Sequence, residues 1–178
     1  VFARIRFRLN QPLFALIIAG LIVPIHVTLI PIYLLTTRVG IYDSLYALIG
    51  PYVAFSLPVS IFILTQFMRQ IPYELEDAAR IDGAGEFRIY WQIVLPLSGP
   101  AIATVFIFHF MYNWNDFLWP LIITMTQEMR TLPTGLALFM GDHNIEYGLL
   151  MAGATLAALP LIVAFLFAQR YFVAGIAL

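Results

Sequence analysis

Ionisable side chains gather in one segment of the sequence, residues 69–96, which carries charges of both signs. Its acidic residues are Glu74, Glu76, Asp77, Asp82 and Glu86, and its arginines are Arg69, Arg80 and Arg88. A mixed-charge segment of this kind is solvated, and its chemistry is ion pairing. The chain has no cysteine, which excludes disulfides, thiolate metal sites and cysteine nucleophiles. We expect no metal site, because no ligand spacing is diagnostic.

The first part of this segment predicts a short helix from Pro72 to about Asp82. Proline is favourable in a first helical turn, and the acids that follow it complement the positive end of a helix. Glu76 and Arg80 stand four residues apart in the better order for an ion pair. One narrow face is formed by Leu75, Ala78, Ala79 and Asp82. Its small side chains would let another protein approach the helix backbone closely.

Gly83 predicts the end of this helix, because glycine adopts the backbone angles of a helix terminus. Asp82 would be badly placed at the negative end, so we interpret it as a cap for the next helix. The segment is therefore a helix, a turn and a second helix. These features alone also fit a solvated amphipathic hairpin with no partner.

A second polar group lies in an apolar stretch. His109 and Asn113 are one helical turn apart, and Tyr112, Trp114 and Asn115 add aromatic and amide groups that stack on and hydrogen-bond to sugars. The alternative is an interhelical hydrogen-bond cluster with no ligand. Other polar groups, Asp116 and the loop residues Asp142, His143, Asn144 and Glu146, are expected to meet solvent or an external protein.

The composition predicts a membrane protein. The chain of 178 residues is 62% hydrophobic and 11% charged, against roughly 45–50% and about 25% in soluble domains. A net charge of -1 without a basic surface excludes nucleic acid as a partner. The chain begins with Val1 and an arginine-rich stretch that lacks a cleavage site, so we expect an excerpt of a longer protein.

Four stretches without charge are long enough to span a bilayer as helices: residues 13–35, 45–68, 97–115 and 147–169. The paired prolines in the first two predict bends that either curve the wall of a pathway or are merely tolerated. Residues 117–125 are too few to span, and Trp119–Pro120 is interpreted as an interfacial element. Most arginines fall on one side of these spans, against Arg38 and Arg130 opposite, so that side, with both ends of the chain, is predicted to be cytoplasmic.

The spacing within residues 77–96 resembles a known signature. Asp77-Ala78-Ala79 is followed by three residues, Gly83, nine residues, Ile93, one residue and Leu95-Pro96. This resembles the loop of permease subunits in binding-protein-dependent ATP-driven (ABC) importers, where the first position is Glu. Further stretches, VPIHVTLIPIYLL, WNDFLWPL and LPLIVAFLFAQRYFVAGI, are similar to the maltose-type, sugar-importing branch. The resemblance covers essentially the whole chain.

The resemblance implies an all-α polytopic bundle of the type I ABC importer permease kind, of which this chain holds four of six spans. Residues 69–96 would be its cytoplasmic coupling loop. The residues that would dock to the ATPase are Glu76, Asp77, Ala78, Ala79, Asp82 and Gly83. The implied partners are a dimer of cytosolic ATPases that holds ATP and Mg, a second homologous permease subunit, an extracytoplasmic solute-binding protein and membrane lipid. The solute would be a sugar or a related compound, passing near His109, Tyr112, Asn113 and Trp114.

Two other classes compete with this hypothesis. An ion-driven secondary carrier would carry ionisable groups within its spans, whereas every acid here lies in a loop or at a boundary. A non-transporting scaffold would show no substrate-dependent ATPase activity in any partner. The chain itself has no phosphate-binding loop of the G-x-x-x-x-G-K-[ST] kind, so it is expected to be a transport subunit and not an enzyme.

Overall fold

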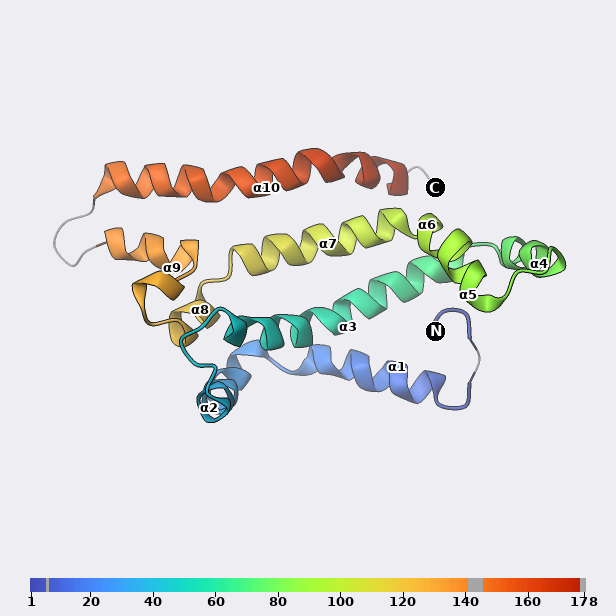
Figure 1. Ribbon diagram of the computed structural model, residues 1–178, viewed down its shortest axis with the longest axis horizontal. Helices are drawn as coiled ribbons and strands as arrows, with labels where there is room; N and C mark the ends of the chain where they lie inside the picture. Colours follow the sequence, from blue (N-terminus) through green and yellow to red (C-terminus); the bar gives the residue numbers. More distant parts are fainter. Residues whose placement is uncertain (6, 141–145, 177–178) are drawn as a thin grey trace. The chain divides into compact units, whose positions relative to one another are not determined.

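The computed structural model describes residues 1–5, 7–140 and 146–176, with side chains as far as residue 169. The regular elements within these ranges are helices, in agreement with the all-α fold expected from the sequence (Figure 1). The chain forms two compact units. The first unit comprises Val1–Ile22, Leu57–Phe108 and Ala168–Leu178, and the second comprises Val23–Ser56 and His109–Phe167.

Two helices are long and apolar enough to cross a membrane by length and composition. They are α3 (Tyr46–Gln70) and the Tyr147–Gln169 part of α10 (Tyr147–Ile176). The 25 residues of α3 measure about 38 Å at 1.5 Å per residue, more than the roughly 30 Å of a hydrocarbon core. These helices fall on the spans predicted over residues 45–68 and 147–169.

The span predicted over residues 13–35 is not one continuous helix. It consists of α1 (Asn10–Ala19), 3₁₀ turns at Gly20–Ile22 and Ile25–Thr28, and α2 (Leu29–Val39). Pro24 stands at the break with an extended backbone, ψ 127°, because proline has no N–H to continue the ladder. Pro31 is tolerated in the first turn of α2, where that N–H is not required. The two halves qualify as a span only when they are taken together.

The core of the second unit forms around a short helix, α8 (Leu118–Ile123). Trp119 and Ile123 are buried and pack against Ala47 and Leu48 at the start of α3, with residues of α2 around them. The interpretation of Trp119–Pro120 as an interfacial element is therefore wrong. Six residues cannot span a membrane, but as a helix they can place two large side chains in a protein core.

The segment between α8 and α10 is built from short helical turns. They are a 3₁₀ turn at Gln127–Met129, α9 (Leu132–Leu136) and a 3₁₀ turn at Ala137–Phe139. Asp142, His143 and Asn144, which the sequence assigned to an outer loop, lie outside the described residues, and Glu146 is exposed. Asp43 connects the turn before α3 to the turn after α8, since its carboxylate accepts the N–H groups of Met125 and Thr126.

The first unit contains the charged segment. The helices of this segment are α4 (Tyr73–Ile81), α5 (Glu86–Ile89), a π-helical turn at Tyr90–Val94 and α6 (Leu95–Leu97), and α7 (Gly99–Trp114) follows and extends into the second unit. A small core of Ile71, Ile89 and Val94, with Ala79 and Ala84 against it, joins α4, α5 and the π-helical turn. The predicted helix, turn and second helix are therefore present.

A 66° bend separates the helix of residues 86–97 from α7, and its causes are local. The Leu95 N–H reaches the Tyr90 carbonyl, five residues back, which widens the helix just before Pro96, a residue that cannot donate. The buried Ser98 then bonds to the Val94 carbonyl through both its N–H, at 3.0 Å, and its Oγ, at 2.7 Å. Such back-bonding bends helices.

Candidate functional site

The candidate site is the charged segment, residues 69–96, and its first helix, α4, ends in a well-formed terminal motif. Gly83 has φ +80°, the left-handed region that glycine adopts without strain. The Gly83 N–H bonds to the Arg80 carbonyl at 3.0 Å, and the Ala84 N–H bonds to the Ala79 carbonyl at 2.9 Å. This is the Schellman arrangement, and the two alanines that accompany it pack into the small core.

The role predicted for Asp82 as a cap of the following helix is wrong. Asp82 is itself the C-cap of α4, and Gly85 stands at the N-cap of α5 with no side-chain hydrogen bond to the helix. The Schellman turn places Gly83, Ala84 and Gly85 between Asp82 and α5, so the carboxylate is too early in the chain to cap it. Asp82 is left exposed.

Arg80 joins α4 to α5 through three carboxylates. Its nitrogens lie 3.4 Å from Glu76, 2.9 Å from Asp77 and 2.9 Å from Glu86. The Glu76–Arg80 pair that the sequence predicts is thus confirmed. The hydrogen bond from Arg80 lowers the pKa of Glu86, and the same contacts raise the pKa of Arg80. The helical hairpin is held as a unit by a cation that stays charged at every physiological pH.

Glu76 also forms an ion pair with Arg4, which belongs to the N-terminal segment. Only 3% of Glu76 is exposed, and the Arg4 Nε lies 3.2 Å from its Oε1. The Arg4 guanidinium also donates to the Ile71 carbonyl and lies 4.3 Å from the centre of the Tyr73 ring. The N-terminal segment is therefore bound to the start of α4 through the ion pair, the hydrogen bond and the ring contact of Arg4.

This contact removes Glu76 from the exposed surface of the loop, where the resemblance had placed it among the docking residues. In the sequence, Arg4 indicated only the side predicted to be cytoplasmic. No periodic pattern links residues so far apart, so only the fold brings them together.

The exposed surface of α4 and α5 differs from the predicted face. Asp77, Ala78, Asp82 and Gly83 are exposed, but Ala79 packs inward. Two large apolar side chains that the sequence analysis did not select are open to solvent, Ile81 at 87% and Phe87 at 77%. Both lie in the same charged segment as the exposed Asp77 and Gly83.

The second predicted site falls on α7. Tyr112 is 52% exposed, and His109 and Asn113 are half-buried. The Trp114 Nε1 donates to the Ala157 carbonyl of α10 at 3.0 Å, and its ring stacks on Phe110. The only donor of Trp114 is therefore used between helices, in the turn before Pro160, where the proline disrupts the ladder of α10.

Asp116, which was expected to meet solvent or an external protein, is instead used within the second unit. One carboxylate oxygen accepts the Tyr52 hydroxyl at 2.9 Å, and the other accepts the Leu118 N–H at 3.2 Å. Asp116 thus connects α3 to the start of α8. No cluster of three or more candidate metal ligands occurs in the described part of the chain.

Long apolar helices joined by a rigid charged hairpin define a multi-pass membrane protein. Residues 1–178 match the family of binding-protein-dependent transport system inner membrane components, and the chain belongs to that family.

Known relatives include a putative ABC transporter permease protein of Caldicellulosiruptor sp., 52% identical over 98% of this chain and 63% of the relative. The arabinooligosaccharides transport system permease protein AraQ of Halalkalibacterium halodurans is 37% identical over 92% of this chain and 58% of its own. The melibiose/raffinose/stachyose import permease protein MelC of Bacillus subtilis is 36% identical over 98% and 63%. The chain thus spans about 60% of the length of these relatives.

One solved structure supports the fold. It is a bacterial ABC transporter involved in the import of the acidic polysaccharide alginate, 24% identical, with a TM-score of 0.69 over 96% of this chain and 65% of the other. At this identity the likeness shows a common fold, that of an importer permease.

Proposed function

We propose that this chain is part of a transmembrane permease subunit of an ATP-driven sugar importer, whose loop 72–96 docks to a cytosolic ATPase. The observation that carries the proposal is the loop itself. Arg4 pairs with Glu76 of α4 and Arg80 joins α4 to Glu86 of α5, while Ile81 and Phe87 are left exposed beside the signature residues Asp77 and Gly83. A preorganised surface with apolar anchors binds a partner with little loss of entropy.

The proposed assembly contains this subunit, a second homologous permease subunit, two ATPases and an extracytoplasmic solute-binding protein within membrane lipid. ATP and Mg would be held by the ATPases, and this subunit would hydrolyse nothing. Both ends of the chain would be cytoplasmic. The docking residues would be Asp77, Ala78, Asp82 and Gly83 with Ile81 and Phe87, while Glu76 and Ala79 would support them from behind.

A sugar or related solute is proposed as cargo. Relatives are named for arabinooligosaccharides and for melibiose, raffinose and stachyose. Of the four residues proposed to line the pathway, His109, Tyr112 and Asn113 remain candidates for solute contact. Trp114 is better suited to holding α7 against α10, because its donor is used there.

Co-purification tests the docking surface. The intact subunit is purified with its candidate ATPase as wild type, Phe87→Ser and Ile81→Ser. Met125→Ser serves as the matched control, because Met125 is also an exposed apolar residue, at 57%, on the side predicted to be external. We expect the ATPase to be retained by wild type and control and lost from the loop variants. Equal retention by all four would reject this surface.

A further inference from the structure

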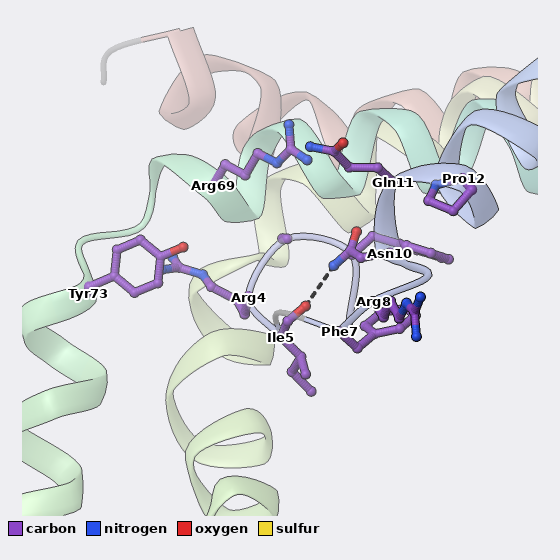
Figure 2. A pocket seen from close by; sticks show the side chains of 11 residues that line it. Arg4, Ile5, Phe7, Arg8, Asn10, Gln11, Pro12, Arg69 and Tyr73 are labelled. Atoms are coloured by element: carbon purple, nitrogen blue, oxygen red, sulfur yellow. Dashed lines mark hydrogen bonds between the residues drawn. The ribbon is translucent and has the colours of Figure 1, made fainter.

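A cavity of about 420 Å³ lies between the N-terminal segment and the end of α3 (Figure 2). Its size falls within the roughly 300–1,000 Å³ typical of ligand sites. Three arginines line it: Arg4 and Arg8 from the N-terminal segment and Arg69 from the last turn of α3. No acidic residue is among the described residues that line it. Because Arg4 is already paired with Glu76, the uncompensated positive charge at the cavity is that of Arg8 and Arg69.

Two of these arginines have no carboxylate partner in the described part of the chain. The ion pairs there involve Arg4 and Arg80, and neither Arg8 nor Arg69 takes part in one. Arg69 is held toward α1 by the Phe14 ring, 5.8 Å away, and Figure 2 shows it extending toward Gln11. Charges of one sign gathered around a concave site attract an anion.

The start of α1 adds to the positive electrostatic potential at the cavity. The helix begins at Asn10 with Leu9 at its N-cap, no side-chain cap and no acid in its first turn. Gln11, in that first turn, lines the cavity. The Asn10 N–H is bonded to the Phe7 carbonyl and Pro12 has no N–H. The start of α1 therefore adds only the partial positive charge of its helix dipole to that of the arginines. Arg4 lines the cavity too, and its buried Nη1 has no hydrogen-bond partner in the described residues.

We propose that this cavity binds the phosphodiester headgroup of an anionic phospholipid. The cavity lies where α3, a helix able to cross a membrane, ends, which is the level of the headgroups. Leu13 and Leu16 follow the lining residues Gln11 and Pro12 on α1 and are exposed, so they would provide an apolar track for acyl chains. A soluble phosphate ester has no acyl chain and would not contact these leucines. Basic pockets between helices on the cytoplasmic side bind anionic headgroups in this way.

The proposal deepens the lipid contact of the proposed function and rests on its placement of the arginine-rich ends at the cytoplasmic surface. Because Tyr73 lines the cavity and also stacks on Arg4, a bound lipid would contact the first residue of α4. The lipid would then stabilise the position of the docking loop.

Native mass spectrometry of the intact subunit, titrated with phosphatidylglycerol or phosphatidylcholine, tests the site. We expect wild type to prefer phosphatidylglycerol. Arg8→Gln and Arg69→Gln should each weaken it about fivefold and the double variant about thirtyfold, since an arginine near anionic lipid contributes about 1 kcal/mol. Lysine at both positions should restore most of the affinity, because the charge is kept. Phosphatidylcholine binding should not change.

Arg88→Gln is the matched control, because it removes the same charge from the same predicted side and its guanidinium bonds to Gln92, outside the cavity. Unchanged phosphatidylglycerol binding in the double variant, or an equal loss in Arg88→Gln, would overturn the proposal. Competition by glycerol 1-phosphate would reassign the cavity to soluble phosphate esters. The single variants decide the question if the double variant loses its helical circular dichroism. The assay contains no ATPase, so its failure would leave the docking proposal intact.

Discussion

Glu76 illustrates how a residue inside a charged, solvated segment can belong to the protein interior. Its neighbours Asp77 and Ala78 are exposed, whereas its own side chain is buried between Arg4 and Arg80. A buried carboxylate is tolerated only when it is paired, so the two arginines are a condition for this conformation of α4.

Replacing Glu76 with Ala should destabilise the protein by about 3–5 kcal/mol, because Arg4 would remain buried without its counter-charge. Thermal unfolding of the purified subunit in detergent measures this loss. Asp77→Ala is the control, since an exposed pair with Arg80 contributes less than about 1 kcal/mol. Arg4→Met together with Glu76→Leu should recover much of the stability. Equal effects at residues 76 and 77 would contradict a buried pair.

Gly83 calls for two different substitutions. Its φ of +80° strains most side chains, but asparagine tolerates that region, and a Cβ would meet no atom within 4 Å. We expect Gly83→Asn to keep the fold and the ATPase, and Gly83→Arg to lose the ATPase in co-purification. If both variants lost it together with helical structure, the position would serve the helix end alone.

At the scale of elements, ionised Glu86 contributes an exposed ion pair with Arg80 to the hairpin of α4 and α5. The bond from Arg80 depresses the pKa of Glu86 below its ordinary 4.5. The stabilisation is therefore complete above about pH 4.5 and is lost as the pH falls through the lower, folded-state value. The protection factors of the loop amides, which correct exchange rates for the intrinsic pH dependence of amide exchange, should fall in that acid range. Glu86→Gln should show the lower protection factors already at pH 7 and a weaker dependence of protection on pH.

Two roles for Trp114 can be distinguished by substitution: holding α7 against α10, and contacting the solute. If its indole serves the helix contact, Trp114→Phe should cost about 0.5–1.5 kcal/mol of stability through loss of the bond to Ala157 and leave the KM for solute unchanged. Uptake kinetics and thermal unfolding measure the two quantities. A raised KM at unchanged stability would return Trp114 to the solute pathway.

Local elements were predictable where the determinants are neighbours in sequence. The helix expected from Pro72 to Asp82 is found at Tyr73–Ile81, with Gly83 at its end, because proline, the acids and glycine act within a few residues. The Arg4–Glu76 pair, the burial of Trp119 and the Tyr52–Asp116 bond depend on segments far apart in sequence. Hydropathy also predicted one continuous span across Pro24. A hydropathy sum counts the polarity of side chains and takes no account of the N–H that proline lacks, where the helix breaks.

At the scale of the whole molecule, the helices expose most of their apolar surface. Only 6% of the spanning window of α10 is buried, against 22% in α3. A surface of that kind requires lipid or other helices around it, as expected of a chain that spans about 60% of its relatives.

Energy source is a property of the complete assembly. Sugar uptake by vesicles that contain the intact importer should stop when ATP is depleted and continue when an ionophore collapses the ion gradients. The reason is that the acids in the described residues lie in loops or at helix ends, where they do not form an intramembrane ion path. Uptake that the ionophore abolishes at normal ATP would favour a secondary carrier.

The pairing of Arg4 with Glu76 has a consequence for how positions 4 and 76 change during evolution. Neither charge is stable in the interior without the other, so a lineage that loses one is under selection to lose or exchange the second. Positions 4 and 76 should therefore vary together among relatives, as a charge pair, a reversed pair or two neutral residues. The neighbouring position 77, whose carboxylate is exposed, should vary independently of position 4.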